Sequence, residues 1–539
     1  MRGVVAAGIA SFAVACAARI DPSRPIYPMP QTRAEASDYN RTSSYGDVMA
    51  FINGLRSRNA PLAYGVIGKT TEGRDIPYLI ASRPIVRTPE EARKLGRPIV
   101  YVNANIHAGE VEGKEALLAL VRDLTYQRGP NVLDSLVLIA VPIYNADGNE
   151  KFADQAVNRR EQNGPELVGT RANGQGLDLN RDYVKAEAPE TRAALAMFDK
   201  WDPDVYVDLH TTDGSFHGFA LTYSPSLSPA SYAPGFAGNL TRDTMLPEIR
   251  ARMHNRGFEV FHYGNFGRED GRDALTDRVK DGWYTYEHTP RYGTNYYGIR
   301  GRVSILSEAF SHDPFKRRVA STYAFVQEIL SAAARHAPQL EQIRVAADKV
   351  QEADVPIRSR MTTKPFDAPI PFEVLTRTGD STRTQAGVPK GVRRTGRFIT
   401  QVMPVYDRFE PTLMVRHPDA YLVPNDAKIV ALLRLHGLAV EPFSSGGATS
   451  QVSVFTIDSV TTSARAFQGH KETRVTGTWS APAARNIAGE YVVVSASGRF
   501  GPLAAYLLEP ESDDGLVDWN FFDTSLATGK PFPVIRLYK

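Results

Sequence analysis

Cysteine is nearly absent from this sequence, since Cys16 is the only one among 539 residues. A single cysteine cannot form a disulfide within the chain, so a small disulfide-stapled scaffold is excluded and the fold must rest on packed cores. An excess of charge of one sign is also missing, because 63 Lys and Arg face 60 Asp and Glu, and this balance gives no reason to expect a nucleic-acid partner. No apolar run reaches the roughly 18 residues that a membrane-spanning helix needs.

The N-terminus differs from the rest of the chain. Arg2 precedes an apolar run at residues 4–15, and Ala15-Cys16-Ala17 resembles a cleavage site. This order of features is typical of a secretory signal, so we predict a signal peptide at residues 1–19 and export to the periplasm or the cell exterior. The other interpretation is a frayed apolar N-terminus. Lipidation of Cys16 is less favoured, because Ala13 stands where lipoprotein signals carry Leu, Val or Ile.

The length of 539 residues favours two to four domains. Between about 46 and 340, short apolar runs alternate with patterns typical of helices. The runs lie at 99–103, 135–143, 204–209 and 302–307, and the helical patterns at 113–126, 190–200 and 315–335. Because uninterrupted apolar strands are buried on both faces, this part is predicted to be an α/β domain with helices on both sides of the sheet.

The flanking segments have other patterns. Residues 20–45 are rich in Pro, Ser and Tyr and are expected to form an extended lead-in. Residues 341–395 carry several prolines and a polar Thr/Arg stretch, and we interpret them as a connection. Residues 396–539 consist mostly of short strand-like runs with one helical pattern at about 425–436, which predicts a β-rich α+β domain at the C-terminus.

Four polar side chains follow the buried strands. They are His107 and Glu110 after 99–103, His210 after 204–209 and Glu308 after 302–307. Functional groups in α/β sheets gather at the carboxyl ends of strands, so we expect these side chains to lie close together. Two histidines and a carboxylate are the ligands of a hydrolytic zinc site with an open fourth position, and a second carboxylate can take a proton from water. The other interpretation is that each residue only makes structural hydrogen bonds or caps a helix.

The motifs in this order resemble the zinc carboxypeptidases related to carboxypeptidase A, over roughly residues 40–335. The resemblance rests on His107-x-x-Glu110, the turn 145–148 (NADG), the segment 176–183 (GLDLNRDY), the helix start 188–191 (APET), His210 and the strand 305–308 (ILSE). It implies a mixed, mostly parallel sheet flanked by helices. It also implies that one Zn²⁺ is held by His107, Glu110 and His210, and that Glu308 deprotonates the zinc-bound water and passes the proton to the leaving amine.

The resemblance further implies how the substrate is held. Asn180 and Arg181 would bind its terminal carboxylate, which suits the planar fork of a guanidinium. An arginine twelve residues after the 145–148 turn would stabilise the oxyanion, and counting gives Arg160, with its neighbour Arg159 as the alternative. Asp178 would orient His107, or would serve only as a turn residue ahead of Asn180.

Two parts of the resemblance are weaker. A substrate-binding tyrosine is expected before Glu308, and spacing does not choose among the five at 284, 286, 292, 296 and 297, of which Tyr292 and Tyr296 are the candidates. The residue before Glu110 is Gly109, where well-studied members of the family carry a substrate-binding arginine. The C-terminal 200 residues or so lie outside the resemblance.

The sequence therefore predicts an exported zinc metallocarboxypeptidase that acts on peptides with a free C-terminal carboxylate. An alternative with the same fold is a zinc amidase or deacylase acting on N-acyl amino acids or cell-wall peptides, which the Gly109 departure favours. A third hypothesis is an inert scaffold whose C-terminal domain binds a polymer or a partner. The sequence favours no oligomeric state and no preferred terminal residue.

Overall fold

The computed structural model describes residues 29–267, 281–349, 354–378, 388, 390–416, 418–444 and 449–538. The predicted signal peptide and Cys16 lie outside the described residues. The expected lead-in at 20–45 contains the short helix α1 (Arg33–Ala36), which begins with a reciprocal cap between Thr32 and Glu35. No helix in the described part of the chain is both long and apolar enough to cross a membrane.

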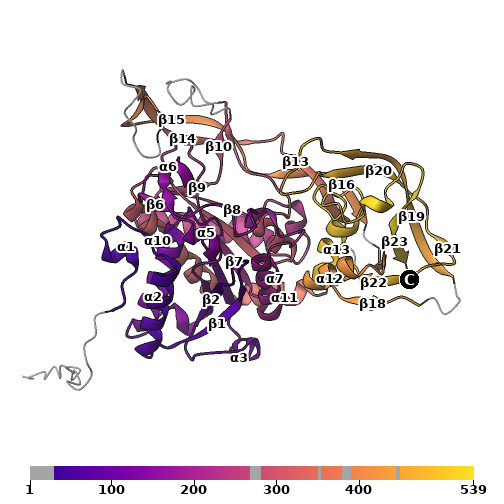
Figure 1. Ribbon diagram of the computed structural model, residues 1–539, viewed down its shortest axis with the longest axis horizontal. Coiled ribbons are helices and arrows are strands. Elements are labelled where there is room, and N and C mark those ends of the chain that lie inside the picture. The colour runs from indigo at the N-terminus through magenta and orange to yellow at the C-terminus, as the bar shows by residue number, and fades with distance from the viewer. Residues whose placement is uncertain are drawn as a thin grey trace, which may run out of the picture. The chain divides into compact units, whose positions relative to one another are not determined.

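The centre of the α/β part is an eight-stranded mixed sheet (Figure 1). In spatial order its strands are β1 (Leu62–Lys69), β2 (Asp75–Ala81), β4 (Val137–Val141), β3 (Ile99–Ala104), β7 (Val205–Thr211), β12 (Val303–Ala309), β8 (Leu221–Pro225) and β9 (Val260–His262). The four central strands β4, β3, β7 and β12 are parallel to one another and buried along their whole length. Every apolar run predicted as a strand from the sequence is present, which confirms the predicted α/β class.

Helices cover both faces of this sheet. They are α2 (Tyr45–Ser57), α3 (Pro89–Lys94), α4 (Glu112–Tyr126), α5 (Ala146–Glu150), α6 (Gln155–Asn158), α7 (Pro189–Trp201), α8 (Leu246–Asn255), α9 (Gly293–Ile299), α10 (Phe315–Arg335) and α11 (Ala337–Ala347). Along β7 the side chains alternate between two cores: Val205 and Val207 pack with α4 and α10, while Tyr206 packs with α7 and α9. This alternation decides which face each polar residue of the strand meets.

The stretch interpreted as a connection, 341–395, is largely regular structure. It contains β13 (Asp354–Met361), which pairs with β16 (Phe409–Arg416), and β14 (Phe366–Arg377), which pairs with β15 (Val392–Tyr406). Its prolines suggested a break, but Pro369 and Pro371 lie on β14 at the edge of a four-stranded sheet, where a missing N–H is tolerated. The other strands of that sheet are β10 (Asn265–Phe266) and β11 (Trp283–Tyr284).

The C-terminal part is built on a seven-stranded sheet. Its strands are β17 (Ala420–Pro424), β18 (Val440–Pro442), β19 (Ser450–Thr462), β20 (Thr473–Trp479), β21 (Ala483–Arg485), β22 (Tyr491–Ser495) and β23 (Pro531–Tyr538). The expected helix is α12 (Ala427–Leu435), and a second helix, α13 (Gly501–Leu508), was not expected. Every residue of α13 is buried, so its sequence lacks the amphipathic period that identifies a surface helix.

Candidate active site

His107 and Glu110 lie on the turn that joins β3 to α4. The turn leaves the strand at Asn105, which has the left-handed φ of 65°, and its amide donates to the carbonyl oxygens of Ala108 and Glu110 at 3.4 and 3.3 Å. The N–H of Glu110 donates to the carbonyl of His107 at 3.0 Å. The local hydrogen bonds therefore turn both side chains toward the same point beyond the end of the sheet.

His210 and Glu308 lie opposite each other on the neighbouring parallel strands β7 and β12. Because β7 also pairs with β3, the strand ends that carry the three candidate ligands and the candidate base are adjacent. The backbone N–H of Thr211 donates to Glu110 Oε2 at 3.1 Å and ties the two ligand-bearing segments together.

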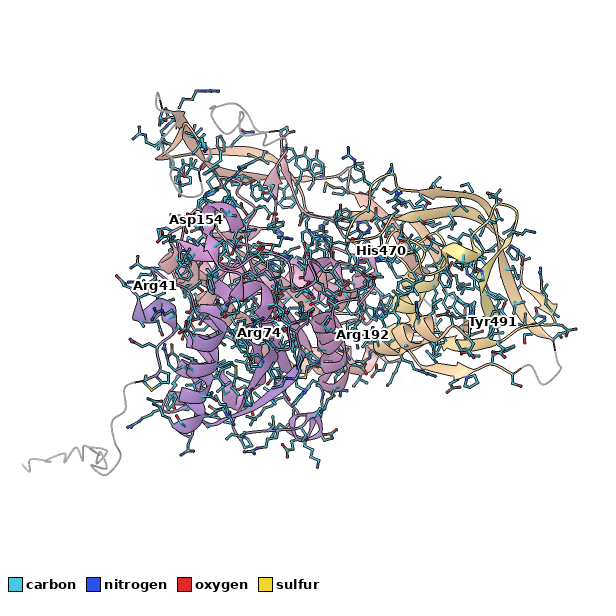
Figure 2. All side chains as sticks on the ribbon, in the orientation of Figure 1. Arg41, Arg74, Asp154, Arg192, His470 and Tyr491 are labelled. Carbon is cyan, nitrogen blue, oxygen red and sulfur yellow. The ribbon has the colours of Figure 1, made fainter. Side chains whose placement is uncertain are left out.

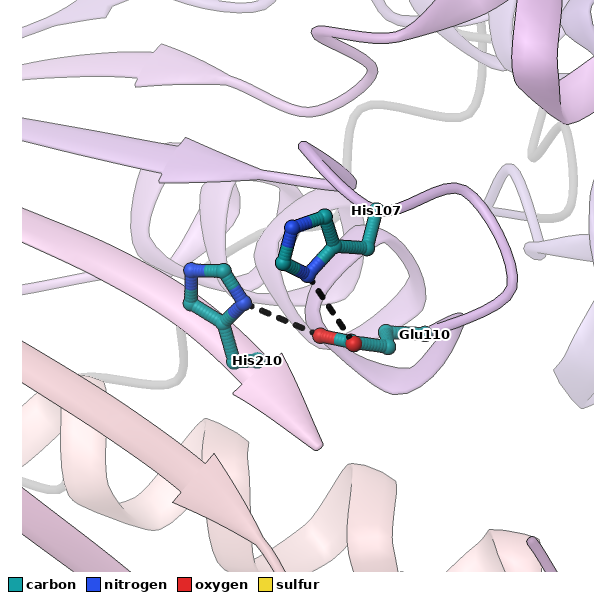
Figure 3. Close-up of side chains that lie close together, drawn as sticks. All are labelled: His107, Glu110 and His210. Carbon is teal, nitrogen blue, oxygen red and sulfur yellow. Dashed lines mark hydrogen bonds and ion pairs between the residues drawn. The ribbon is translucent and has the colours of Figure 1, made fainter. Parts of the chain in front are cut away.

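The three candidate ligands converge on one point (Figure 3). The Nδ1 atoms of His107 and His210 each lie 3.0 Å from an oxygen of the Glu110 carboxylate, and the donor atoms are all within 4.8 Å of one another. All three side chains are buried. Two imidazole nitrogens and a carboxylate at this spacing fit a Zn²⁺ ion with a position left for water.

Two aspartates hold the outer nitrogens of the histidines. Asp178 Oδ1 lies 3.0 Å from Nε2 of His107, and Asp208 Oδ2 lies 3.0 Å from Nε2 of His210 as an ion pair rather than an aligned hydrogen bond. A carboxylate can only accept, so in the neutral His107 ring the proton lies on Nε2, toward Asp178, and the lone pair on Nδ1 faces the metal position. The resemblance implies this role for Asp178, whereas no motif in the sequence points to Asp208, which stands two positions before His210 on the same strand face.

The two glutamates of the site differ in their electrostatics. Burial by itself raises the pKa of Glu110, but Arg159 and His107 outweigh it and hold that pKa well below its ordinary value. Burial raises the pKa of Glu308 well above its ordinary value, with His210 opposing and Glu110 adding to the effect. Within the described part of the chain, Glu308 Oε2 has no hydrogen-bond partner. Glu110 is thus suited to remain an ionised ligand, and Glu308 to exchange a proton.

The arginine predicted by counting does not lie at the site. Arg160 is exposed and does not line the cavity beside the ligands. Its neighbour Arg159 is buried, with Nη1 3.1 Å from Glu110 Oε1 and Nη2 donating to the carbonyls of Thr211 and Thr212 at 2.6 and 3.0 Å. Arg159 therefore supports the Glu110 ligand and the end of β7, and it does not line the cavity either.

Arg171 is the arginine that does line the cavity. Its Nε donates to Asp178 Oδ2 at 2.8 Å, and its Nη1 lies 3.7 Å from Glu110 Oε1. No spacing in the sequence points to Arg171, because the loop between the 145–148 turn and Asn180 brings this arginine back to the site and residue counting cannot follow the path of a loop. The turn itself supports that return, since the Asn145 amide donates to the carbonyls of Ile106 and Arg171 at 3.2 and 3.1 Å.

A cavity of about 250 Å³ opens beside the ligands and Glu308. Its other walls include Arg171, Asn180, Arg181, Asp213, Tyr263, Tyr286, Glu287, Tyr292 and Thr294. The guanidinium carbon of Arg181 lies 4.0 Å from the centre of the Tyr292 ring, and Asn180 Oδ1 accepts from the N–H of Gly293 at 2.9 Å. The cavity thus combines the metal position, an unpartnered carboxylate oxygen and a cationic wall.

Tyr296 does not reach the cavity. It is fully buried, and its hydroxyl lies 2.7 Å from Nδ1 of His436 in the C-terminal part of the chain. The structure therefore corrects the prediction of Tyr296 as a substrate contact, because α9 turns this side chain into the core while Tyr292, at the start of the helix, faces the cavity.

Gly109 departs from the expected arginine for a steric reason. A Cβ atom at this position would lie 3.0 Å from the carbonyl oxygen of Gly169 and 3.6 Å from Cβ of Arg159. The space beside Glu110 is occupied by Arg159, and Arg171 approaches the same carboxylate. A cation does stand next to the ligand set, and it comes from another segment of the chain.

Comparisons with known proteins agree with this geometry. Residues 48–233 match the model of the family described as zinc carboxypeptidase. Carboxypeptidase 2 of Trichophyton rubrum is 24% identical over 530 residues, which cover 90% of this chain and 85% of that protein. Carboxypeptidase M of Mus musculus is 31% identical over 170 residues, which cover 29% of this chain and 34% of that protein.

A solved metallo-carboxypeptidase from Burkholderia cenocepacia aligns with 54% of this chain and 69% of its own, with 17% sequence identity and a TM-score of 0.38. The family match spans the β3–α4 turn, the 176–183 segment and β7, and so includes all three candidate ligands. The family match and the sequence relatives therefore support a zinc carboxypeptidase domain at residues 48–233 and a metallocarboxypeptidase activity for this chain.

Proposed function

We propose that this protein removes C-terminal residues from peptides, with Glu308 as the general base. The observation that carries the proposal is that one cavity is lined by the three converging ligands, by Glu308 and by the pair Asn180 and Arg181. A peptide whose terminal carboxylate meets Arg181 would place its last peptide bond near the ligands. An internal peptide bond would bring no carboxylate to this wall.

Zn²⁺ held by His107, Glu110 and His210 would supply a Lewis acid that polarises the scissile carbonyl and lowers the pKa of water. Glu308, directly across from His210 on the next strand, takes the proton of the attacking water and delivers it to the leaving amine. Asp178 and Asp208 keep the two imidazoles in the orientation that the reaction needs.

Arg181 binds the terminal carboxylate of the substrate, and Arg171 stabilises the negative charge that develops on the scissile carbonyl oxygen. Arg181 stacks on Tyr292, so its guanidinium is already oriented when the terminal carboxylate arrives. Arg171 is held by Asp178 beside the ligands, where the carbonyl oxygen of the scissile bond gains negative charge. Arg159 is already committed to Glu110 and to β7 and takes no part in binding substrate.

Peptide pairs that differ only at the C-terminus test the proposal. The full chain, loaded with Zn²⁺, is incubated with peptides ending in a free acid and with the same peptides ending in an amide, and products are followed by mass spectrometry. We expect stepwise loss of residues from the acids, little cleavage of the amides, and loss of activity after chelation that Zn²⁺ restores. A zinc-loaded protein that leaves all peptides intact but cleaves N-acyl amino acids or cell-wall peptides would instead be a deacylase or amidase.

Export is proposed from the sequence of the N-terminus alone, through the apolar run at residues 4–15 and the small residues that follow it. Fractionation of producing cells, with N-terminal sequencing of the mature chain, tests it. A mature chain that begins near residue 20 in the exported fraction supports the proposal. A chain that keeps Arg2 and stays in the cytoplasmic fraction contradicts it.

A further inference from the structure

The segment that supplies Tyr286, Glu287 and Tyr292 to the cavity wall also contacts the C-terminal part of the chain. Arg291, directly before Tyr292, is buried, and the carboxylate of Asp514 accepts two hydrogen bonds from it. Asp514 Oδ2 accepts from the backbone N–H of Arg291 at 2.7 Å, and Asp514 Oδ1 accepts from its Nε at 2.8 Å. The backbone and the side chain of the residue next to Tyr292 are thereby fixed together.

The guanidinium of Arg291 is enclosed by further C-terminal residues. Glu472 Oε1 lies 2.8 Å from its Nη2, and the ring of Trp519 lies 4.8 Å from its central carbon. The indole N–H of Trp519 donates to Asp514 Oδ1 at 2.9 Å. A second anchor lies earlier in the segment, where Nε2 of His288 is 2.8 Å from Asp513 Oδ2.

Consecutive residues connect Arg291 to the proposed binding site for the substrate's terminal carboxylate. Tyr292 follows Arg291 and stacks on Arg181, and Gly293 follows Tyr292 and donates its N–H to Asn180 Oδ1. Because the amide oxygen of Asn180 accepts this bond, its NH₂ group lies on the other side of the amide. The orientation of the two groups that would bind the substrate carboxylate thus depends on where Arg291 is held.

The loop between β19 and β20 makes a second contact with the α/β part, at Asp178. Gln468, which has a left-handed φ of 49°, accepts from the backbone N–H of Asp178 at 2.9 Å through its side-chain oxygen. His470, labelled in Figure 2, lies on the same loop with Nε2 3.0 Å from Glu187 Oε1. Asp178 in turn holds His107 and Arg171.

We propose that the C-terminal part of the chain completes the substrate site, with Asp514 and Gln468 as positioning residues that act through Arg291 and Asp178. Neither side chain lines the cavity, so neither is a catalytic residue. The inference rests on the proposed function, since it concerns the binding of the substrate's terminal carboxylate and the support of His107 and Arg171. It gives the C-terminal sheet, which lies outside the matched residues 48–233, a part in the reaction.

Steady-state kinetics of four variants of the zinc-loaded full chain test the proposal. Gln468→Ala removes the acceptor for Asp178, whereas Gln468→Glu keeps an acceptor oxygen there. Glu472→Gln weakens the ion pair with Arg291, and Glu490→Gln, at an exposed site directly before β22, is its control. In Glu472→Gln we expect KM for free-acid peptides to rise about three- to tenfold with kcat and zinc content nearly unchanged. In Gln468→Ala we expect kcat/KM to fall by about the same factor, because Asp178 holds His107 and Arg171. Gln468→Glu and the control should keep wild-type values.

Asp514→Asn disturbs the contact with Arg291 more directly, but it also removes a buried charge and can lower stability. Its effect is therefore followed by amide hydrogen exchange, which does not depend on activity. We expect faster amide hydrogen exchange at residues 288–293 in this variant, with exchange in β3 and β7 unchanged. Wild-type KM in Glu472→Gln together with wild-type kcat/KM in Gln468→Ala, or unchanged exchange at 288–293, would overturn the inference. If the wild-type chain cleaves no peptide, the proposed function fails, and the exchange experiment still decides whether Asp514 positions this segment.

Discussion

At the scale of single residues, the site depends on which polar atoms are left without a partner inside the protein. Glu308 Oε2 has none among the described residues, while Glu110 receives bonds or ion pairs from Thr211, Arg159 and both histidines. A buried carboxylate oxygen with no partner is costly, and proteins keep such groups where chemistry needs them. The two glutamates are therefore distinguished by their surroundings rather than by their chemistry.

The first prediction concerns Glu308. Glu308→Gln keeps the size of the side chain but cannot accept a proton, so we expect kcat to fall about 10²-fold or more while zinc content stays at the wild-type level. Metal analysis alongside steady-state kinetics checks both parts. Turnover near that of the wild type would remove Glu308 from the role of general base.

The second prediction separates the two arginines that counting and structure assign differently. Arg171→Ala removes a guanidinium from the cavity wall and is expected to lower kcat/KM about 10²-fold, the scale of one group that stabilises an oxyanion. Arg160→Ala changes an exposed residue outside the cavity and should leave kcat/KM within a factor of two. Equal losses in the two variants, measured with one peptide, would contradict the assignment.

At the scale of elements, β7 carries both the candidate ligand His210 and Asp208, whose carboxylate lies beside its ring. Asp208 and His210 stand on one face of the strand because side chains alternate, and this is the face of Tyr206. Asp208 is itself held by Asn103, directly across on β3, whose amide donates to Asp208 Oδ1 at 3.2 Å. The pairing of β3 with β7 therefore helps to set the orientation of the His210 ring.

The third prediction follows from this arrangement. Asp208→Asn removes the charge beside Nε2 of His210, so zinc affinity should fall about 10- to 100-fold with little change in the fold. Competition with a chelator of known affinity measures the change, and the exposed Asp38→Asn serves as the control. An affinity equal to that of the control would show that Asp208 does not support the metal site.

At the scale of the whole described chain, the α/β part and the C-terminal sheet share one hydrophobic core. The cluster that includes Phe198 and Tyr297 also contains Leu433 and Val494. Within it, His436 accepts from the Tyr296 hydroxyl at 2.7 Å and donates to the carbonyl of Val184 at 3.0 Å. The two parts are therefore expected to unfold together rather than independently.

The fourth prediction uses the buried His436. Burial lowers the pKa of this imidazole to about 4, whereas in the unfolded chain it is about 6.5, so the unfolded state binds more protons between these values. Stability should consequently be lost as the pH falls from 6.5 to 4, by up to about 3 kcal/mol from this group. Thermal unfolding between pH 4 and 7 should show a shallower pH dependence in His436→Gln, and parallel curves for variant and wild type would refute the assignment.

The sequence by itself determined the central strands and pointed to the candidate ligands. Runs of apolar residues that no surface strand could carry identified the central strands, and His107, Glu110, His210 and Glu308 followed from their places at strand ends. Prolines misled the interpretation of 341–395, because an edge strand tolerates them, and α13 carried no amphipathic period. Where local periodicity is strong, the sequence is sufficient.

Only the tertiary structure decided which arginine, which second aspartate and which tyrosine belong to the site. Arg171 returns through a loop whose path depends on distant contacts, Asp208 acts through a neighbouring strand, and Tyr292 rather than Tyr296 faces the cavity because of how α9 packs. The contact between Asp514 and Arg291 also left no sign in the sequence, since 223 positions separate the two residues. Contacts between distant segments leave no period in the sequence, because they depend on how complete elements pack.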